Sequence, residues 1–151
     1  MARKPRNKRE QTRLTLIEAT IQSIVEIGLP DTTVTSIMQR AGLSRGMLHL
    51  HFVSKDELLE ATAAFFAEDY YEKQEAFLKN VGKDPISRLK AMIDADFSEE
   101  LLNQTTAIVW YALRSVAHTN EAIRQHATTR DQRLLDAYNE IFKDLVLRKN
   151  G

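Results

Sequence analysis

Polar and basic side chains between Thr33 and Lys55 are the residues of this 151-residue chain whose types and spacing best fit a chemical role. Arg45 is the most specific of them, because a guanidinium can donate two hydrogen bonds to O6 and N7 of a guanine. Its plainer alternative is a solvent-facing arginine. Lys55 suits a phosphate, because the start of a helix adds a positive dipole to the lysine charge. The predicted DNA contacts are Thr33, Ser44, Arg45, Gly46, Met47, His49, His51 and Lys55.

The remaining candidates have narrower roles. Gly46 lets the backbone approach the groove closely, and an outward-pointing Met47 can meet a thymine methyl group. Thr33, Ser44 and His51 are candidates for phosphate contacts. Thr33 and Ser44 are equally well explained as helix caps, because a side-chain oxygen at that position accepts a free backbone N–H.

No catalytic or metal-binding pattern accompanies these residues. His49 and His51 lie two apart on an expected helix, so their side chains diverge and cannot hold one ion together. Asp94 and Asp96 diverge for the same reason. The chain has no cysteine and no phosphate-cradling glycine loop or nucleophile elbow. We therefore expect no enzymatic activity, no cofactor and no metal.

The elements that must position these side chains are two short helices joined by a tight turn. Thr33 caps the first helix, and Gly42 supplies the left-handed backbone that ends it. Ser44 is the expected cap of the second helix, in which Leu48 and Phe52 are the inward anchors. This is the plan of a helix-turn-helix, whose second helix enters the major groove of DNA.

Helical periodicity and capping residues continue through the rest of the chain. Ser54 with Glu57 is the pattern of a capping box, and Asp84-Pro85 is the pattern of a cap followed by proline at the first helical position. Asn120 is the expected cap of the last helix. We expect helices at about residues 10–27, 55–80, 85–97 and 105–118, and one that begins after Asn120.

These elements predict an all-α fold, which the small number of glycines (five) and prolines (three) favours. We expect a basic arm at residues 1–9, and then a three-helix helix-turn-helix domain at residues 10–55. A long helix joins it to a helical ligand-binding and dimerisation domain at residues 56–151. The arm is either a solvated tail or a contact to phosphates or the minor groove.

The neutral net charge of the chain hides a strong polarity. Residues 1–55 hold nine Lys and Arg against four Asp and Glu, and residues 56–151 hold 12 against 17, so the balances are +5 and −5. A basic front on an acidic body is expected when only the front meets phosphates. No apolar run approaches the length of a membrane span or resembles a signal peptide, so we expect a cytoplasmic protein with no membrane contact.

Aromatic residues in the second half are candidates for a ligand pocket. If several of them surround a cavity beside a carboxylate, they can bind a quaternary ammonium through cation–π contacts. The plainer alternative is that they are ordinary core residues. The candidates are Phe65, Phe66, Asp94, Phe97, Trp110 and Tyr111.

A longer pattern in the front of the chain consists of Thr33, Ile37, Ala41-Gly42-Leu43-Ser44, Gly46, Leu48, His51-Phe52, Ser54-Lys55 and Leu58-Leu59. It resembles the DNA-binding domain of the tetracycline-repressor (TetR) family. Met38 departs from the usual alanine, and His49-Leu50 departs from a common Tyr-His. The absent tyrosine hydroxyl is a usual phosphate contact, so either His49 replaces it or the contact is lost.

The rear of the chain resembles, more loosely, the regulatory domain of choline-responsive repressors of the betaine pathway (the BetI type). The supporting stretches are 96–99, 107–110 and 115–118. Members of the family usually continue for two more helices, which pair between subunits. We therefore expect either a truncated chain, without its C-terminal dimerisation helices, or another mode of dimerisation.

The resemblance implies a homodimeric repressor that binds a pseudo-palindromic DNA operator. A small-molecule inducer, for which a quaternary ammonium is one candidate, would release it from that operator. The alternative is a truncated or non-dimerising helical module for protein–protein interaction, with only weak DNA binding.

Overall fold

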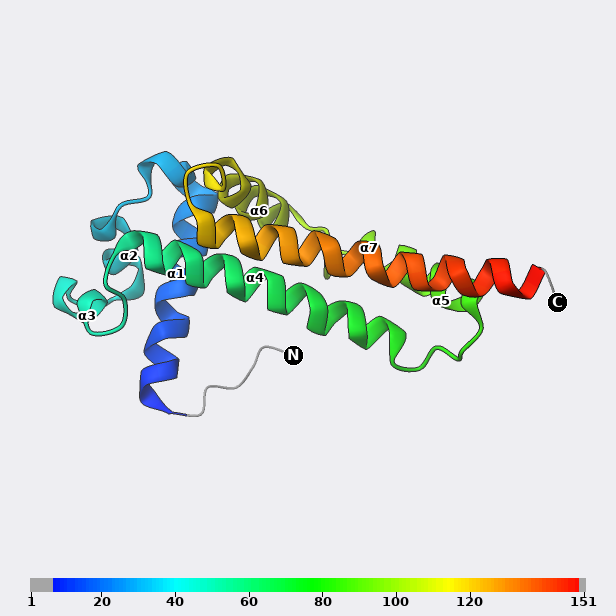
Figure 1. The fold of residues 1–151 in the computed structure, drawn as a ribbon. Coiled ribbons are helices and arrows are strands. Elements are labelled where there is room, and N and C mark those ends of the chain that lie inside the picture. Colours follow the sequence, from blue (N-terminus) through cyan, green and yellow to red (C-terminus); the bar gives the residue numbers. More distant parts are fainter. Residues whose placement is uncertain (1–6, 150–151) are drawn as a thin grey trace.

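The computed structural model describes residues 7–149, which form seven helices and no strand. The expected all-α fold is therefore confirmed. In Figure 1 the short helices α2 and α3 lie at one end beside α1, while α4 and α7 run lengthwise toward the other end. The helices are α1 (Lys8–Asp31), α2 (Val34–Ala41), α3 (Arg45–His49), α4 (Lys55–Leu78), α5 (Pro85–Asp96), α6 (Gln104–Val116) and α7 (Glu121–Lys149).

Helix α1 begins earlier and ends later than expected. The Asn7 side chain accepts the backbone N–H of Glu10 at 2.9 Å, so the helix begins at Lys8 and not at Glu10. Gly28 interrupts it with φ 78° and ψ 160°, as its position in the sequence predicted, but one more helical turn follows before Thr32. Of the basic arm predicted at residues 1–9, residues 1–6 lie outside the described part of the chain.

The other helix starts follow their capping residues. Asp84 accepts the N–H of Ser87 at 2.9 Å, and Asn120 accepts that of Ile123 at 3.0 Å, as expected. Ser54 caps α4 through Glu57 N–H at 3.2 Å. The predicted capping box is only half formed, because the Glu57 carboxylate accepts the N–H of Val53, the residue before the cap. Helices α4 and α6 end two residues before the predicted limits, at Leu78 and Val116.

The core of the described residues consists of three buried clusters, of which the two larger ones divide it into a front and a rear part, and the third joins α4 to α5 and the segment after it. The front cluster joins α1, α2, α3 and the start of α4, and includes Leu16, Ile37 and Leu48. The second joins α1 and α4 to α6 and α7. Because α1 and α4 contribute to both clusters, the front is packed firmly onto the rear. The domain boundary between residues 55 and 56 stays a prediction.

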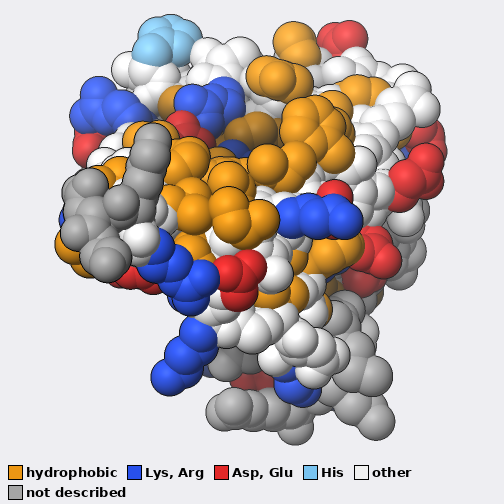
Figure 2. All heavy atoms as spheres, turned by 90° about the vertical axis from the view of Figure 1, so that its right-hand side faces the viewer, with side chains coloured by type: hydrophobic (Ala, Val, Ile, Leu, Met, Phe, Trp, Pro, Cys, Tyr) orange, Lys and Arg blue, Asp and Glu red, His pale blue; other side chains and the backbone are white. Residues whose placement is uncertain are grey.

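An apolar strip remains exposed on α5 and α7. The two helices run antiparallel, because Asp84 accepts a hydrogen bond from Arg148 at 2.7 Å and Asp96 accepts one from Tyr138 at 2.6 Å. Each exposes apolar side chains at spacings i, i+7 and i+11, which lie on one helical stripe. Figure 2 views the molecule from the end where α7 finishes and shows hydrophobic side chains gathered there. The strip consists of Ile86 and Ile93 on α5, Phe97 directly after it, and Leu135, Phe142 and Val146 on α7.

Candidate nucleic-acid interface and ligand pocket

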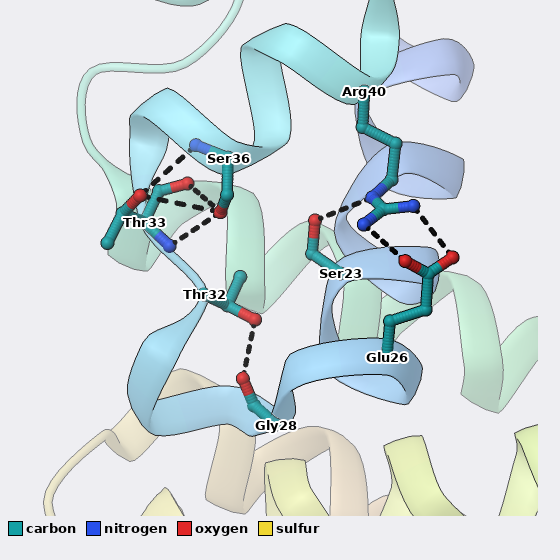
Figure 3. Close-up of polar contacts among 7 residues, drawn as sticks. All are labelled: Ser23, Glu26, Gly28, Thr32, Thr33, Ser36 and Arg40. Atoms are coloured by element: carbon teal, nitrogen blue, oxygen red, sulfur yellow. Dashed lines mark hydrogen bonds and ion pairs between the residues drawn. The ribbon is translucent and has the colours of Figure 1, made fainter.

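The start and the end of α2 are both fixed by short-range features. The Thr33 hydroxyl accepts the N–H of Ser36 at 3.1 Å, and the Ser36 hydroxyl accepts the N–H of Thr33 at 2.9 Å, as Figure 3 shows. Gly42 ends α2 with φ 66° and ψ 28°, the left-handed conformation that the sequence predicted. The backbone N–H of Leu43 donates to the carbonyl of Met38 at 3.1 Å and closes the turn that leads into α3.

A bidentate ion pair locks α2 against α1. Arg40 donates to both carboxylate oxygens of Glu26, at 2.8 and 2.7 Å, and its Nε lies 3.2 Å from the Ser23 hydroxyl (Figure 3). Its guanidinium is therefore engaged within the protein. No sequence pattern marks this role of Arg40, because Glu26 and Ser23 lie on another helix.

Helix α3 is short, with one face packed against the front cluster and the other exposed to solvent. Leu48 is buried, as predicted. Arg45 is exposed and, within the described residues, has no hydrogen bond or ion pair. Gly46 and His49 are also exposed, and a Cβ built on Gly46 would meet no atom within 4 Å. This surface can accept an external partner without breaking an internal contact.

Two candidates on this helix differ from expectation. Met47 is half-buried and packs against the front cluster, so it does not point freely outward. Its backbone N–H donates to the carbonyl of Ser44 at 2.9 Å, in the first turn of the helix. Ser44 occupies the cap position of α3, but its side chain makes no cap hydrogen bond.

The segment after α3 is held by Arg13 from α1. Arg13 donates to the backbone carbonyl of His51 and places its guanidinium 4.0 Å from the centroid of the buried Phe52 ring. The His51 ring is half-buried, and within the described residues its Nδ1 has no hydrogen-bond partner. Arg13 was not among the predicted site residues, because it lies 38 positions from His51 in the sequence.

Lys55 is half-buried at the first position of α4, six residues after His49 in the sequence. Two apolar side chains near it were also missed. Leu50 and Val53 are 66% and 85% exposed, although hydrophobicity alone predicts burial for both.

A pocket of about 410 Å³ lies among α4, α6 and α7. Phe66, Trp110 and Tyr111 line it together. Phe65 does not, because consecutive residues point about 100° apart on a helix, and it lines a separate hollow against α1.

The other two predicted pocket residues are also elsewhere. Asp94 and Phe97 are exposed on α5 and at its end, and neither lines the pocket. The face of α5 that carries Met92 and Ala95 is the buried one, so Asp94 and Phe97 are turned toward solvent. The predicted set of six therefore does not form one cage.

The charged lining of the pocket comes from residues that the sequence analysis did not select. Arg114 Nη1 lies 2.8 Å from one carboxylate oxygen of Asp131, and Arg130 Nη1 lies 3.4 Å from the other. The Arg130 guanidinium also lies 4.0 Å from the centroid of the Tyr70 ring and 4.8 Å from that of Trp110. Helices α4, α6 and α7 thus meet around Arg130.

Behind the pocket, a carboxylate joins two phenols. The hydroxyls of Tyr70 and Tyr138 each donate to Asp96, both at 2.6 Å. Burial, reinforced by the hydrogen bond to Asp96, raises the pKa of both tyrosines well above the usual value. Both phenols therefore stay protonated at neutral pH and tie α4 and α7 to α5.

Neither region has the ligands of a metal centre or the span of a membrane helix. Within residues 7–149 no group of three or more His, Asp or Glu side chains lies close enough to hold a metal ion. None of the described helices combines the length and apolarity that crossing a bilayer requires.

Known proteins share both the sequence and the architecture of this chain. The family model described as "Bacterial regulatory proteins, tetR family" matches residues 16–62, which include α2, α3 and the start of α4. "HTH-type transcriptional regulator BetI" of Burkholderia cenocepacia (strain HI2424) is 37% identical over 124 residues, covering 81% of this chain and 64% of that protein. The protein with the same description from Stenotrophomonas maltophilia (strain R551-3) is 34% identical over 139 residues, covering 92% and 69%.

Solved structures share the fold. One from Pseudomonas aeruginosa PAO1 superposes with a TM-score of 0.85 at 24% identity, over 95% of this chain and 69% of the other. A TetR transcription regulator from Haloarcula marismortui ATCC 43049 superposes with a TM-score of 0.82 at 20% identity, over 92% and 72%. The family model and the sequence relatives, together with the helix-turn-helix, show that this chain belongs to the TetR family of bacterial regulatory proteins.

Proposed function

We propose that this protein is a sequence-specific DNA-binding transcriptional repressor that acts as a homodimer and is released from its operator by a small molecule. The observation that carries the proposal is the surface of α3, where Arg45 extends into solvent with no partner among the described residues. It belongs to a helix-turn-helix whose scaffold is fully packed. The chain spans 64% of the Burkholderia relatives' length, so the activity of the whole protein is part of the proposal.

Base and phosphate contacts divide among the exposed residues. Arg45 is proposed to read a guanine, and Gly46 to let the backbone approach the groove. Thr33, Ser44, His49, His51 and Lys55 are proposed phosphate contacts. Met47, being half-buried, has at most the edge of its side chain available for a thymine methyl group.

A homodimer would place two copies of α3 in successive major grooves, about 34–36 Å apart along the duplex. The apolar strip on α5 and α7 supports association, because exposed apolar side chains that share a stripe on a helix favour burial against a second surface. A protein that binds the chromosome in this way acts in the cytoplasm.

The pocket among α4, α6 and α7 is the proposed inducer site. Phe66 and Tyr70 belong to α4, and the same helix begins at Lys55 beside the helix-turn-helix. A ligand that prefers one position of α4 would shift the population between DNA-binding and released states. The sequence predicts a quaternary ammonium as one candidate inducer, with Trp110 and Tyr111 as its aromatic partners, but the two arginines already placed over Trp110 weigh against it.

The proposal is tested by gel-shift titration of the full chain against duplexes selected from a random pool, at 50 and 200 mM salt. We expect a pseudo-palindromic duplex whose affinity falls about 10³-fold or more over this range, because cations that neutralise phosphates release counterions. An absent or salt-independent shift would overturn the proposal.

The second candidate is a helical module for protein–protein interaction, which the exposed strip on α5 and α7 also favours. It predicts a monomer in sedimentation and only weak binding to any duplex. A dimer at micromolar concentration with selective DNA binding would exclude it.

A further inference from the structure

We propose that the pocket among α4, α6 and α7 binds a small organic anion, with its carboxylate held by Arg130 and Arg114. The inference rests on the proposed function only in taking this pocket as the effector site. It concerns the charge of the ligand, which the aromatic residues alone do not determine.

The charges that line the pocket favour an anion. Arg114 and Arg130 both face it, and Asp131 is the single carboxylate among the lining residues. Asp131 is shared by the two arginines, at 2.8 and 3.4 Å. A guanidinium has five N–H donors, and Asp131 is the one hydrogen-bonding partner of Arg130 among the described residues. Donors therefore remain for a second carboxylate.

The aromatic faces are already used by an internal cation. Arg130 lies over Tyr70 and over Trp110, at 4.0 and 4.8 Å from the ring centroids, and Arg114 lies 5.7 Å from the centroid of Trp110. A quaternary ammonium would have to displace these guanidinium groups from the same rings and would be repelled by them. A carboxylate would instead meet two cations that the rings hold in place.

The rest of the lining suits the body of a small acid. Phe66, Leu101 and Ala107 contribute apolar surface, and the volume of about 410 Å³ is near the lower end for ligand pockets. A planar aromatic acid would fit both features, because its ring can pack on Trp110 while its carboxylate meets the planar guanidinium groups.

Trp110 is the single tryptophan of the chain and lines the pocket, so its fluorescence reports occupancy directly. We would titrate the full chain with benzoate, with the neutral isostere benzamide and with the cation benzyltrimethylammonium. We expect the dissociation constant of benzoate to be at least about tenfold lower than that of either other ligand, because only benzoate makes charge-assisted hydrogen bonds to the arginines. Equal or tighter binding of benzamide or the cation, or no saturable response to benzoate, would overturn the proposal.

Two substitutions test the assignment in opposite directions. Arg130→Met should weaken benzoate binding about tenfold or more, whereas Asp131→Asn should tighten it several-fold by freeing both arginines. Arg133→Met is the matched control, because Arg133 makes a similar contact over Tyr71, at 4.6 Å, outside the pocket lining. A loss on Asp131→Asn in a folded protein, or an equal loss in all three variants, would contradict the proposal.

The selected-duplex titration, carried out without any ligand, separates the two proposals. DNA binding without benzoate binding would refute the anion site and leave the repressor standing. Benzoate binding without DNA binding would refute the repressor and leave the anion site standing.

Discussion

At the helix-turn-helix, Arg45 points into solvent with no partner among the described residues, whereas in the pocket Arg114 and Arg130 share Asp131 and lie over aromatic rings. The difference indicates two kinds of binding surface. A bare arginine on a rigid helix suits a large polyanion that brings its own charge and shape. Partly neutralised arginines in a pocket suit a small ligand that must compete with an internal carboxylate.

The two regions also differ in how they are held. Backbone hydrogen bonds between residues three and five apart build the turn before α3. The pocket depends on residues from three helices, and α1 and α4 connect the two regions through both buried clusters. A structural change in the pocket can therefore reach α3 through α1 and α4. Substitutions in these two helices can interrupt that coupling.

The largest expected effect comes from emptying the front core. Phe52→Ala should lower the free energy of unfolding by about 3–5 kcal/mol, because it leaves a cavity under α3 and removes the ring that Arg13 contacts. Chemical denaturation measures this loss, and DNA binding should fall with it. Leu113→Ala is the rear counterpart, with a cost of about 2–5 kcal/mol. If Leu113→Ala, at equal residual stability, abolished DNA binding as fully as Phe52→Ala does, the two regions would not be separable.

A smaller effect distinguishes Arg45, which has no partner among the described residues, from Arg40, which pairs with Glu26. Arg45→Ala should relax the preference for one base pair by about 1–3 kcal/mol and leave stability unchanged. Arg40→Ala should lower stability by about 1 kcal/mol or less, because the Glu26 partner is largely exposed, and should leave base preference intact. Binding to single-base variants of the selected duplex and denaturation measure both. The reverse pattern would assign Arg40, not Arg45, to the DNA.

Substitutions at two glycines distinguish a residue required for backbone conformation from a residue proposed to contact DNA. Gly42→Ala should destabilise the protein by about 1–2 kcal/mol, because alanine is strained at φ 66°. Gly46→Ala should be neutral or stabilising by about 0.5–1 kcal/mol, since it lies in α3 with open space around it. If Gly46 lies against the groove, the same variant should bind DNA more weakly. Unchanged DNA affinity of Gly46→Ala would remove this residue from the interface.

The smallest effect is on the pH dependence of stability. Burial and Asp96 raise the folded-state pKa of Tyr70 and Tyr138 above the ordinary value of about 10. In the unfolded chain these phenols ionise at that ordinary value, so their stabilising contribution is complete below about pH 10 and is lost as the pH rises further. Denaturation between pH 8 and 11 should show this decline, and Tyr138→Phe should make it shallower. A decline of equal steepness in Tyr138→Phe would contradict the role of this pair.

Features with short-range causes were predictable from the sequence. Thr33, Gly42 and Asn120 cap or end helices through partners within a few residues, and each does so as predicted. Glu57 is a residue whose hydrogen-bond partner could not be predicted from local spacing alone. Its position predicted a capping box, but its carboxylate binds the N–H of Val53, because several backbone donors lie within reach of one side chain.

Features with long-range causes were not predictable. Arg40 binds Glu26 across 14 positions, Arg13 binds His51 across 38, and Tyr138 binds Asp96 across 42. No local pattern marks such partners. For the same reason the aromatic residues of the rear were identified as a class, but the arginines that occupy their faces were not.

The most direct test of the account is the ratio of dissociation constants of the full chain for a scrambled duplex and for the selected duplex, measured at 150 mM salt. A helix-turn-helix that reads bases through an unpaired arginine predicts a ratio of about 10³ or more. A ratio near one would mean that the basic front binds phosphates without reading sequence, and would contradict the assignment of α3 as a recognition helix.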